Sequence, residues 1–205
     1  MKKYFLFYWF VGLLFFSICT RAEELNHPAQ KQLQQNVDLI LNTVHNSELN
    51  EGQKIKQIEQ YADKYLDYER LTALAVGLPW RQFSAQQKQD FIAAFKSMIV
   101  RLYAHSALLG ANKAKISVSA KIINQNEQKV ETFTNIISPN GKQIEVGYQM
   151  YLQDGIYRIY NIRVNGTSLV TLYRNQFNEL IQKKGIDGAI AEISNKGLNN
   201  KNLIK

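Results

Sequence analysis

The sequence predicts an α+β fold in which a curved four-stranded antiparallel sheet packs against about six helices. Three observations lead to this prediction. Apolar residues recur at helical intervals before residue 110, alternate with polar residues between residues 115 and 164, and return to helical intervals after residue 169. Tight turns join the successive strands, and strands joined in this way are antiparallel. Helices, then a meander of strands, then helices indicate one sheet backed by helices on one side.

The first 22 residues have the pattern of a cleaved secretory signal peptide. Lys2 and Lys3 precede an apolar run from Tyr4 to Ile18, and small residues precede a cut after Ala22. The run is shorter than the about 20 residues that a membrane-spanning helix needs. We therefore expect a periplasmic protein with one domain over residues 23–196 and a polar tail over residues 197–205.

Charge and cysteine content limit the possible partners. The formal net charge is +8, and it falls to +5 once Lys2, Lys3 and Arg21 leave with the signal peptide. Cys19 leaves with them, so we expect a mature chain without disulfides, and Phe16-Ser17-Ile18 fits a lipoprotein signal poorly. An exported protein does not normally meet nucleic acid. The spread positive charge suits an anionic membrane face, or it only keeps the protein in solution.

Three helices are expected before the long one. Pro28 can begin the first, because a proline loses no hydrogen bond in the first turn. Asn50 and Gln53 have the spacing of a capping box and begin the second. A third helix over residues 68–75 ends at Gly77, which suits a C-terminal cap.

The longest helix follows a turn at Pro79-Trp80-Arg81. Ser84 and Gln87 form another capping box, and the helix runs from Ala85 to about Leu109. Its apolar residues recur every three or four positions, which is typical of a helix with one buried face. This inner face carries Phe91, Phe95, Met98, Ile99 and Leu102.

Four strands follow, with turns at residues 124–127, 138–141 and 153–155. The fourth strand, residues 156–164, carries large apolar groups on both faces. Strict alternation places Tyr157, Ile159, Asn161 and Arg163 on one face, and Ile156, Arg158, Tyr160, Ile162 and Val164 on the other.

Helical spacing resumes after the fourth strand. Residues 165–168 break the strand, and Ser168 is expected to cap a helix that runs to Lys184. Gly185 should break this helix, and Asp187 should cap a last short one.

Groups suited to catalysis or metal binding are few. His27, His45 and His105 are scattered, and no spacing suits zinc. Glu59 and Asp63 lie four residues apart on a helix, which a solvated face explains more simply. Ser168 lacks the nucleophile-elbow pattern. We therefore expect no enzymatic activity, no metal and no cofactor.

Tyrosines are common in the mature chain, which keeps nine of them. Tyrosine combines an apolar ring with a polar tip, so it suits an apolar cavity that opens to water. A densely packed core can use the same residues. Composition alone leaves both interpretations open.

Four motifs carry a resemblance to a known family. They are RVNGTSLVTLYRNQF (residues 163–177), VGLPWRQFSAQQKQDFIAAF (residues 76–95), Asp67-Tyr68, and the strand VGYQM (residues 146–150). In this order, behind a signal peptide, they resemble the MlaC family of periplasmic phospholipid-binding proteins. The resemblance implies an NTF2-like fold that encloses an apolar cavity.

The resemblance also implies a function and partners. A member of this family is a soluble carrier with a phospholipid ligand, and it makes and breaks no covalent bond. It exchanges lipid between an outer-membrane lipoprotein–porin complex and an inner-membrane ABC transporter with a substrate-binding MCE subunit. This exchange maintains the lipid asymmetry of the outer membrane.

We expect the concave face of the sheet and the long helix to wall the cavity. Two arginines, Arg81 and Arg174, are candidates for a rim that meets a lipid phosphate, although ordinary surface salt bridges explain either arginine equally well. The candidate lining residues are Trp80, Met98, Tyr103, Val118, Phe133, Val146, Tyr148, Tyr160, Val164, Leu169 and Tyr173.

Two alternatives from other classes remain. An enzyme on a similar NTF2-like cone needs a buried carboxylate or histidine in its pocket. An interaction module without bound lipid would have a packed core and keep its partner when Val146 or Tyr148 becomes glutamate.

Overall fold

The computed structural model describes residues 27–111, 114–121 and 129–196. The expected signal peptide, the turn at residues 124–127 and the C-terminal tail lie outside these residues. Among the described helices, none has the length and apolar character needed to cross a membrane. The helices are α1 (Pro28–His45), α2 (Glu51–Tyr65), α3 (Tyr68–Val76), the 3-10 helix η1 (Leu78–Gln82), α4 (Ala85–Ala111) and α5 (Leu169–Lys196).

Both predicted capping boxes are confirmed. The Gln53 backbone N–H donates to Asn50 Oδ1 at 3.0 Å, and the Asn50 N–H donates to Gln53 Oε1 at 2.9 Å. Ser84 and Gln87 make the same reciprocal pair, at 3.1 and 3.0 Å. Side chains thus satisfy backbone donors that the first turn of each helix leaves unpaired.

The described chain has five α-helices where about six were expected, because the two helical stretches on either side of Gly185 form one element, α5. The break expected at Gly185 is a kink inside α5, where the backbone takes a φ of 71° and a ψ of 178°. Only glycine adopts this conformation without strain. The helical backbone is therefore interrupted at Gly185, as expected, and two helical stretches meet at this kink.

The sheet has five strands, in the order β1-β2-β3-β4-β5, instead of the expected four. All neighbouring pairs are antiparallel. Asn165 and Gly166, at φ values of 48° and 81°, turn the chain back so that two more residues pair with β4. The strands are β1 (Lys115–Lys121), β2 (Lys129–Ile137), β3 (Gln143–Gln153), β4 (Ile156–Val164) and β5 (Thr167–Ser168).

A β-bulge at Tyr160 changes which residues of β4 share a face. Ile159 pairs with Met150 and Asn161 with Gln149, so Tyr160 has no partner in the register. The extra residue reverses the alternation after it. Ile162 and Val164 therefore lie on the same face as Tyr157 and Ile159, and the prediction of strict alternation along this strand is wrong.

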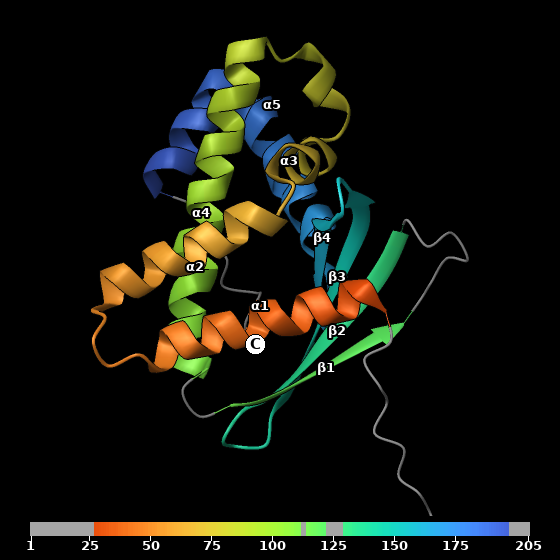
Figure 1. The fold of residues 1–205 in the computed structure, drawn as a ribbon. Helices are drawn as coiled ribbons and strands as arrows, with labels where there is room; N and C mark the ends of the chain where they lie inside the picture. Colours follow the sequence, from red (N-terminus) through yellow and green to blue (C-terminus); the bar gives the residue numbers. More distant parts are fainter. Residues whose placement is uncertain (1–26, 112–113, 122–128, 197–205) are drawn as a thin grey trace, which may run out of the picture.

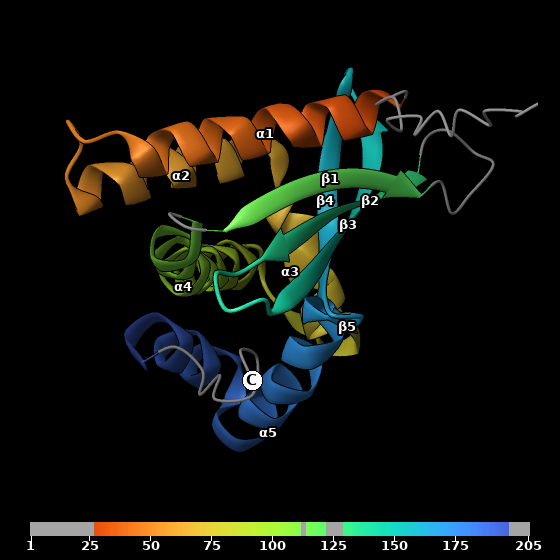
Figure 2. The ribbon, with the colours of Figure 1, turned by 90° about the horizontal axis from the view of Figure 1, so that it is seen from below.

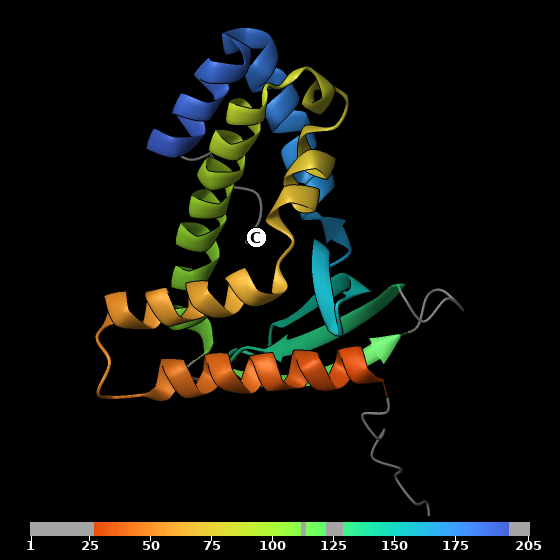
Figure 3. The ribbon, with the colours of Figure 1, turned by 45° about the horizontal axis from the view of Figure 1, so that its top comes forward.

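The helices pack against one face of the sheet. Helix α1 runs along the strands, and α4 lies between the α1–α2 pair and α5 (Figures 1 and 2). Helix α2 lies beside α1 and crosses α4 (Figure 3). The sheet residues that belong to the hydrophobic clusters, Val130, Tyr148, Met150, Tyr157, Ile159, Ile162 and Val164, all lie on this face.

Aromatic rings form the centre of the helical core. Phe95 packs edge-on against Tyr173 and Phe177, with ring centroids 5.0 and 4.9 Å apart. Phe91 packs edge-on against Phe177 at 4.9 Å. Such offset arrangements are the favoured geometry for aromatic pairs. Together with aliphatic side chains of α3, these rings pack α3, α4 and α5 against one another.

Candidate functional site

The face of the sheet that meets the helices is the candidate site. The register aligns its side chains in rows across the strands. We call it the helix-facing sheet face. Its rows are Ile116–Ile136–Ile144, Val118–Thr134–Val146–Val164, Thr132–Tyr148–Ile162, Val130–Met150–Ile159 and Leu152–Tyr157.

The helices cover this face unevenly. Val130, Met150 and Ile159 are 5%, 0% and 6% exposed, because α1 and the end of α2 pack over them. The first two rows differ, since their isoleucine and valine side chains are only half-buried. We call these two rows the half-covered rows. An enclosed cavity, which we expected, is not seen among residues 27–111, 114–121 and 129–196.

Polar groups on this face are satisfied within it. The hydroxyl groups of Thr134 and Tyr148 lie 3.2 Å apart, and the Thr132 hydroxyl donates to the sulfur of Met150 at 3.3 Å. Burial raises the pKa of the Tyr148 phenol, against a smaller opposing effect of its hydrogen bond with Thr134. The phenol is therefore neutral at physiological pH. The named rows contain no carboxylate or imidazole, so they offer an uncharged surface.

Four of the predicted lining residues lie together on this face. Val118, Val146 and Val164 occupy one row, and Tyr148 stands next to Val146 in the neighbouring row. The flanking residues Ile116, Ile136, Ile144 and Ile162 were not among the predicted lining residues. Alternation along β1 and β3 contained this information for Ile116 and Ile144. For Ile162 it did not, because the bulge at Tyr160 intervenes.

Four other predicted lining residues belong to the helical core. Met98, Leu169 and Tyr173 are 3%, 2% and 0% exposed within the aromatic cluster. Trp80 packs at its edge, with its ring 5.2 Å from that of Phe83. Val164 also touches this cluster, so the core borders the half-covered rows at that point.

The remaining predicted lining residues lie elsewhere. Phe133 lies on the opposite face of the sheet, because its neighbours Thr132 and Thr134 occupy the helix-facing side. Tyr160, at the bulge, packs against Arg70, whose guanidinium lies 4.9 Å from its ring. The side chain of Tyr103 lies outside the described part of the chain.

The two arginines proposed for a rim have different surroundings. Arg174 donates from Nε and Nη2 to the carbonyl oxygen of Leu74, at 3.1 and 2.7 Å. This carbonyl lies in the last turn of α3, where backbone acceptors lack helical partners. Arg174 therefore stabilises the end of α3. Arg81 lies exposed on η1.

Comparisons with known proteins agree with this architecture. The family model described as MlaC protein matches residues 32–195. A solved structure, the phospholipid-binding protein from Ralstonia solanacearum in complex with a phospholipid, is similar with a TM-score of 0.67 and 27% sequence identity. The likeness covers 80% of this chain and 94% of that chain. No match was found among curated proteins.

Proposed function

Because the chain belongs to the MlaC family, we propose that it is a phospholipid carrier that holds acyl chains against the helix-facing sheet face. The observation that carries this proposal is the pair of half-covered rows. Isoleucine and valine side chains there face the helices without being fully packed by them. An acyl chain has the apolar character and the flexibility to fill such a space. The similar protein from Ralstonia solanacearum was solved with a phospholipid, which supports the same ligand class.

The energetics explain why such a carrier would exchange lipid with membranes. Each buried methylene gains about 0.8 kcal/mol relative to water, so two acyl chains gain more than about 20 kcal/mol. Release into water is therefore very slow. A bilayer offers the acyl chains the same apolar surroundings, so transfer between protein and bilayer is nearly neutral in free energy. A docked partner can then set its direction.

The proposed setting is the bacterial periplasm. Residues 1–22 would direct export and be removed. The carrier would receive and deliver lipid at an outer-membrane lipoprotein–porin complex and at an inner-membrane ABC transporter with an MCE subunit. In this role it maintains outer-membrane lipid asymmetry and catalyses no reaction.

The proposed contact residues are those of the half-covered rows and their immediate neighbours. Val118, Val146 and Val164 form one row, and Tyr148 adds an aromatic surface with its hydroxyl tied to Thr134. Met98, Leu169 and Tyr173 support these residues from the helical core.

Lipid extraction followed by mass spectrometry tests the proposal. The purified protein should carry phospholipid, or acquire it from vesicles. The Val146→Glu variant should lose at least about tenfold of this lipid, because a buried charge against acyl chains is costly. A matched control is Gln143→Glu, which adds the same charge at an exposed position on the other face of the same strand.

The proposal also requires a fold control, and two results would overturn it. Thermal melts should show that both variants remain folded, and the control should keep its lipid. A wild-type protein without lipid under both conditions would overturn the proposal, as would equal lipid content in the two variants.

A further inference from the structure

Helices α1 and α2 form a hairpin whose two arms are tied to each other. Thr43 Oγ1 of α1 lies 3.2 Å from Gln57 Oε1 of α2. The Lys54 ammonium of α2 donates to the carbonyl oxygen of Val44, on α1, at 2.7 Å. These contacts join the two helices along their length (Figure 3). The α1–α2 hairpin, residues 28–65, can therefore move as one body.

Both ends of the α1–α2 hairpin are attached to the same strand, β4. Near the start of α1, Gln32 Nε2 donates to the carbonyl oxygen of Tyr157 at 2.7 Å, and the Tyr157 N–H donates to Gln32 Oε1 at 2.9 Å. Just after α2, the backbone N–H of Asp67 donates to the carbonyl oxygen of Ile159 at 2.9 Å. The two attachment points are neighbours on one strand, so together they can act as a hinge.

The other end of the hairpin is held by a small apolar contact. The loop between α1 and α2 lies beyond α4, away from the sheet (Figures 1 and 3). Within α2, Ile58 is the one fully buried residue, and it packs with Val44 of α1 and Ala104 of α4. The aromatic cluster, in contrast, joins α4 to α3 and α5 through many buried side chains. Little apolar surface therefore holds α2 on α4.

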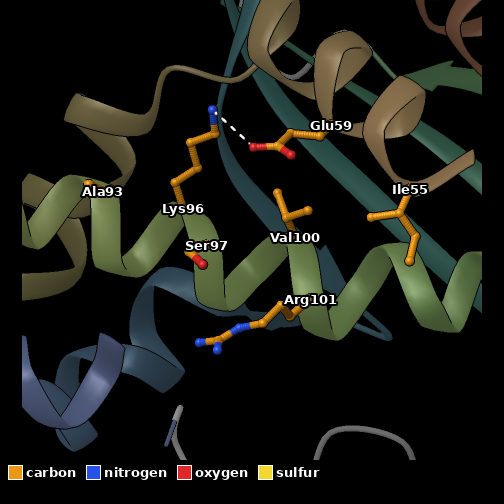
Figure 4. A pocket seen from close by; sticks show the side chains of 7 residues that line it. All are labelled: Ile55, Glu59, Ala93, Lys96, Ser97, Val100 and Arg101. Atoms are coloured by element: carbon orange, nitrogen blue, oxygen red, sulfur yellow. Dashed lines mark ion pairs between the residues drawn. The ribbon is translucent and has the colours of Figure 1, made fainter. Parts of the chain in front are cut away.

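A group of ion pairs completes the contact between α2 and α4. Lys96 Nζ on α4 lies 3.3 Å from Glu59 Oε1 and 2.8 Å from Asp63 Oδ2, both on α2. Beside these pairs the two helices leave a hollow, lined by Ile55 of α2 and Val100 of α4 among others (Figure 4). The two carboxylate side chains are 38% and 43% exposed, so water can replace the ammonium at small cost.

We propose that the α1–α2 hairpin is a lid, which turns about its attachment to β4 and opens the helix-facing sheet face to acyl chains. The ion pairs of Lys96 are the latch that holds the lid on α4. This inference rests on the proposed function, because a phospholipid must pass between the sheet and the helices that cover it. Helix α1 packs over Val130 and Met150, so its movement uncovers the part of the sheet next to the half-covered rows.

A closed lid keeps bound acyl chains away from water, and an open lid lets a membrane or a docked partner exchange them. The small contact at α4 suits this role, because the closed state must be favoured without being locked. Helices α3, α4 and α5 stay in place during the movement, since their shared core is closely packed.

The rate of lipid transfer tests the latch. The protein is loaded with a pyrene-labelled phospholipid, and fluorescence follows its transfer to acceptor vesicles. Lys96→Met should transfer lipid about two- to fivefold faster, the range expected when a half-exposed ion pair is lost. The matched control is Lys183→Met, which removes an exposed ion pair with Glu179 inside α5 and should keep the wild-type rate.

A cross-link tests the lid itself. The expected mature chain contains no cysteine, so Glu59→Cys/Lys96→Cys can be joined selectively by a short bis-maleimide in the folded protein. Transfer should then fall at least about tenfold relative to the same variant before cross-linking, because the lid can no longer leave α4. The control is Glu179→Cys/Lys183→Cys, whose cross-link stays within α5 and should leave the rate unchanged.

The possible failures can be told apart. Unchanged transfer after the α2–α4 cross-link, with lipid still bound, would overturn the lid and leave the carrier proposal intact. Equal rates in Lys96→Met and Lys183→Met would overturn the latch. A wild-type protein that takes up no phospholipid would overturn the carrier proposal and the lid together.

Discussion

Gly147 has no side chain and so leaves room for its neighbours on the sheet face opposite to the helices. A Cβ atom there would lie 3.0 Å from both Glu131 Oε1 and Phe133 Cε1. The absence of a side chain lets Glu131 reach across to Arg163, whose Nη1 lies 3.4 Å from Oε1. Glu131 is only 2% exposed, so this contact matters for a carboxylate that has left water.

We predict that Gly147→Ala destabilises the protein by about 1–3 kcal/mol, because the new methyl group overpacks the buried Glu131 and the half-buried Phe133. Chemical denaturation measures this change. Gly52→Ala in α2 is the contrasting variant, since its Cβ would meet only Asn50 Oδ1, at 3.5 Å. Alanine favours helix there by up to about 1 kcal/mol. Equal stability of the two variants would contradict the account of Gly147.

The ionisation of Tyr148 makes the stability of the protein depend on pH. Burial raises the pKa of its phenol above the ordinary value of about 10. The unfolded chain has the ordinary pKa and the folded protein the higher one. At a pH between the two, the phenol is deprotonated in the unfolded chain and protonated in the folded protein. The free energy of unfolding therefore falls as the pH rises above about 10.

We predict that the free energy of unfolding of Tyr148→Phe falls less steeply with pH than that of the wild type. The difference in slope corresponds to at most one bound proton. Urea denaturation at a series of pH values from neutral to above 10 measures the slope. Some slope should remain, because burial and the nearby Asp63 and Glu59 carboxylates also raise the pKa of Tyr68. An unchanged slope in the variant would mean that the phenol of Tyr148 is exposed to solvent.

Local signals were sufficient to predict the helix ends. The capping boxes at Asn50 and Ser84 depend on side chains and backbone within four residues, so their spacing in the sequence contains the full interaction. The cap at Gly77 is equally local, with a φ of 73°. The same holds for Ser168, whose hydroxyl accepts from the Thr171 N–H at 3.3 Å, as predicted.

Strand faces depend on partners far away in the sequence, and there the prediction was less complete. The bulge at Tyr160 becomes visible only in the pairing of β4 with β3. Along β2, threonines occupy the apolar face, while Phe133 lies opposite. Thr132 and Thr134 tolerate the apolar face because Met150 and Tyr148 satisfy their hydroxyl groups, which no pattern within β2 reveals.

The whole molecule combines a closely packed part with a part that is less completely packed. The aromatic cluster of α3, α4 and α5 is closed, with Phe91, Phe95, Tyr173 and Phe177 each 0% exposed. The half-covered rows lie beside it on the sheet. This division suits a carrier, because the closely packed core can hold the sheet in place while ligand fills the half-covered part.

The position of a bound acyl chain tests this account most directly. A crystal structure with a phospholipid that carries bromine on its acyl chains would locate the bromine atoms by anomalous scattering. The account predicts bromine against Val118, Val146, Tyr148 and Val164, between the sheet and the helices. Bromine only on the opposite face, near Phe133, or only on the outer surface of the helices would contradict it.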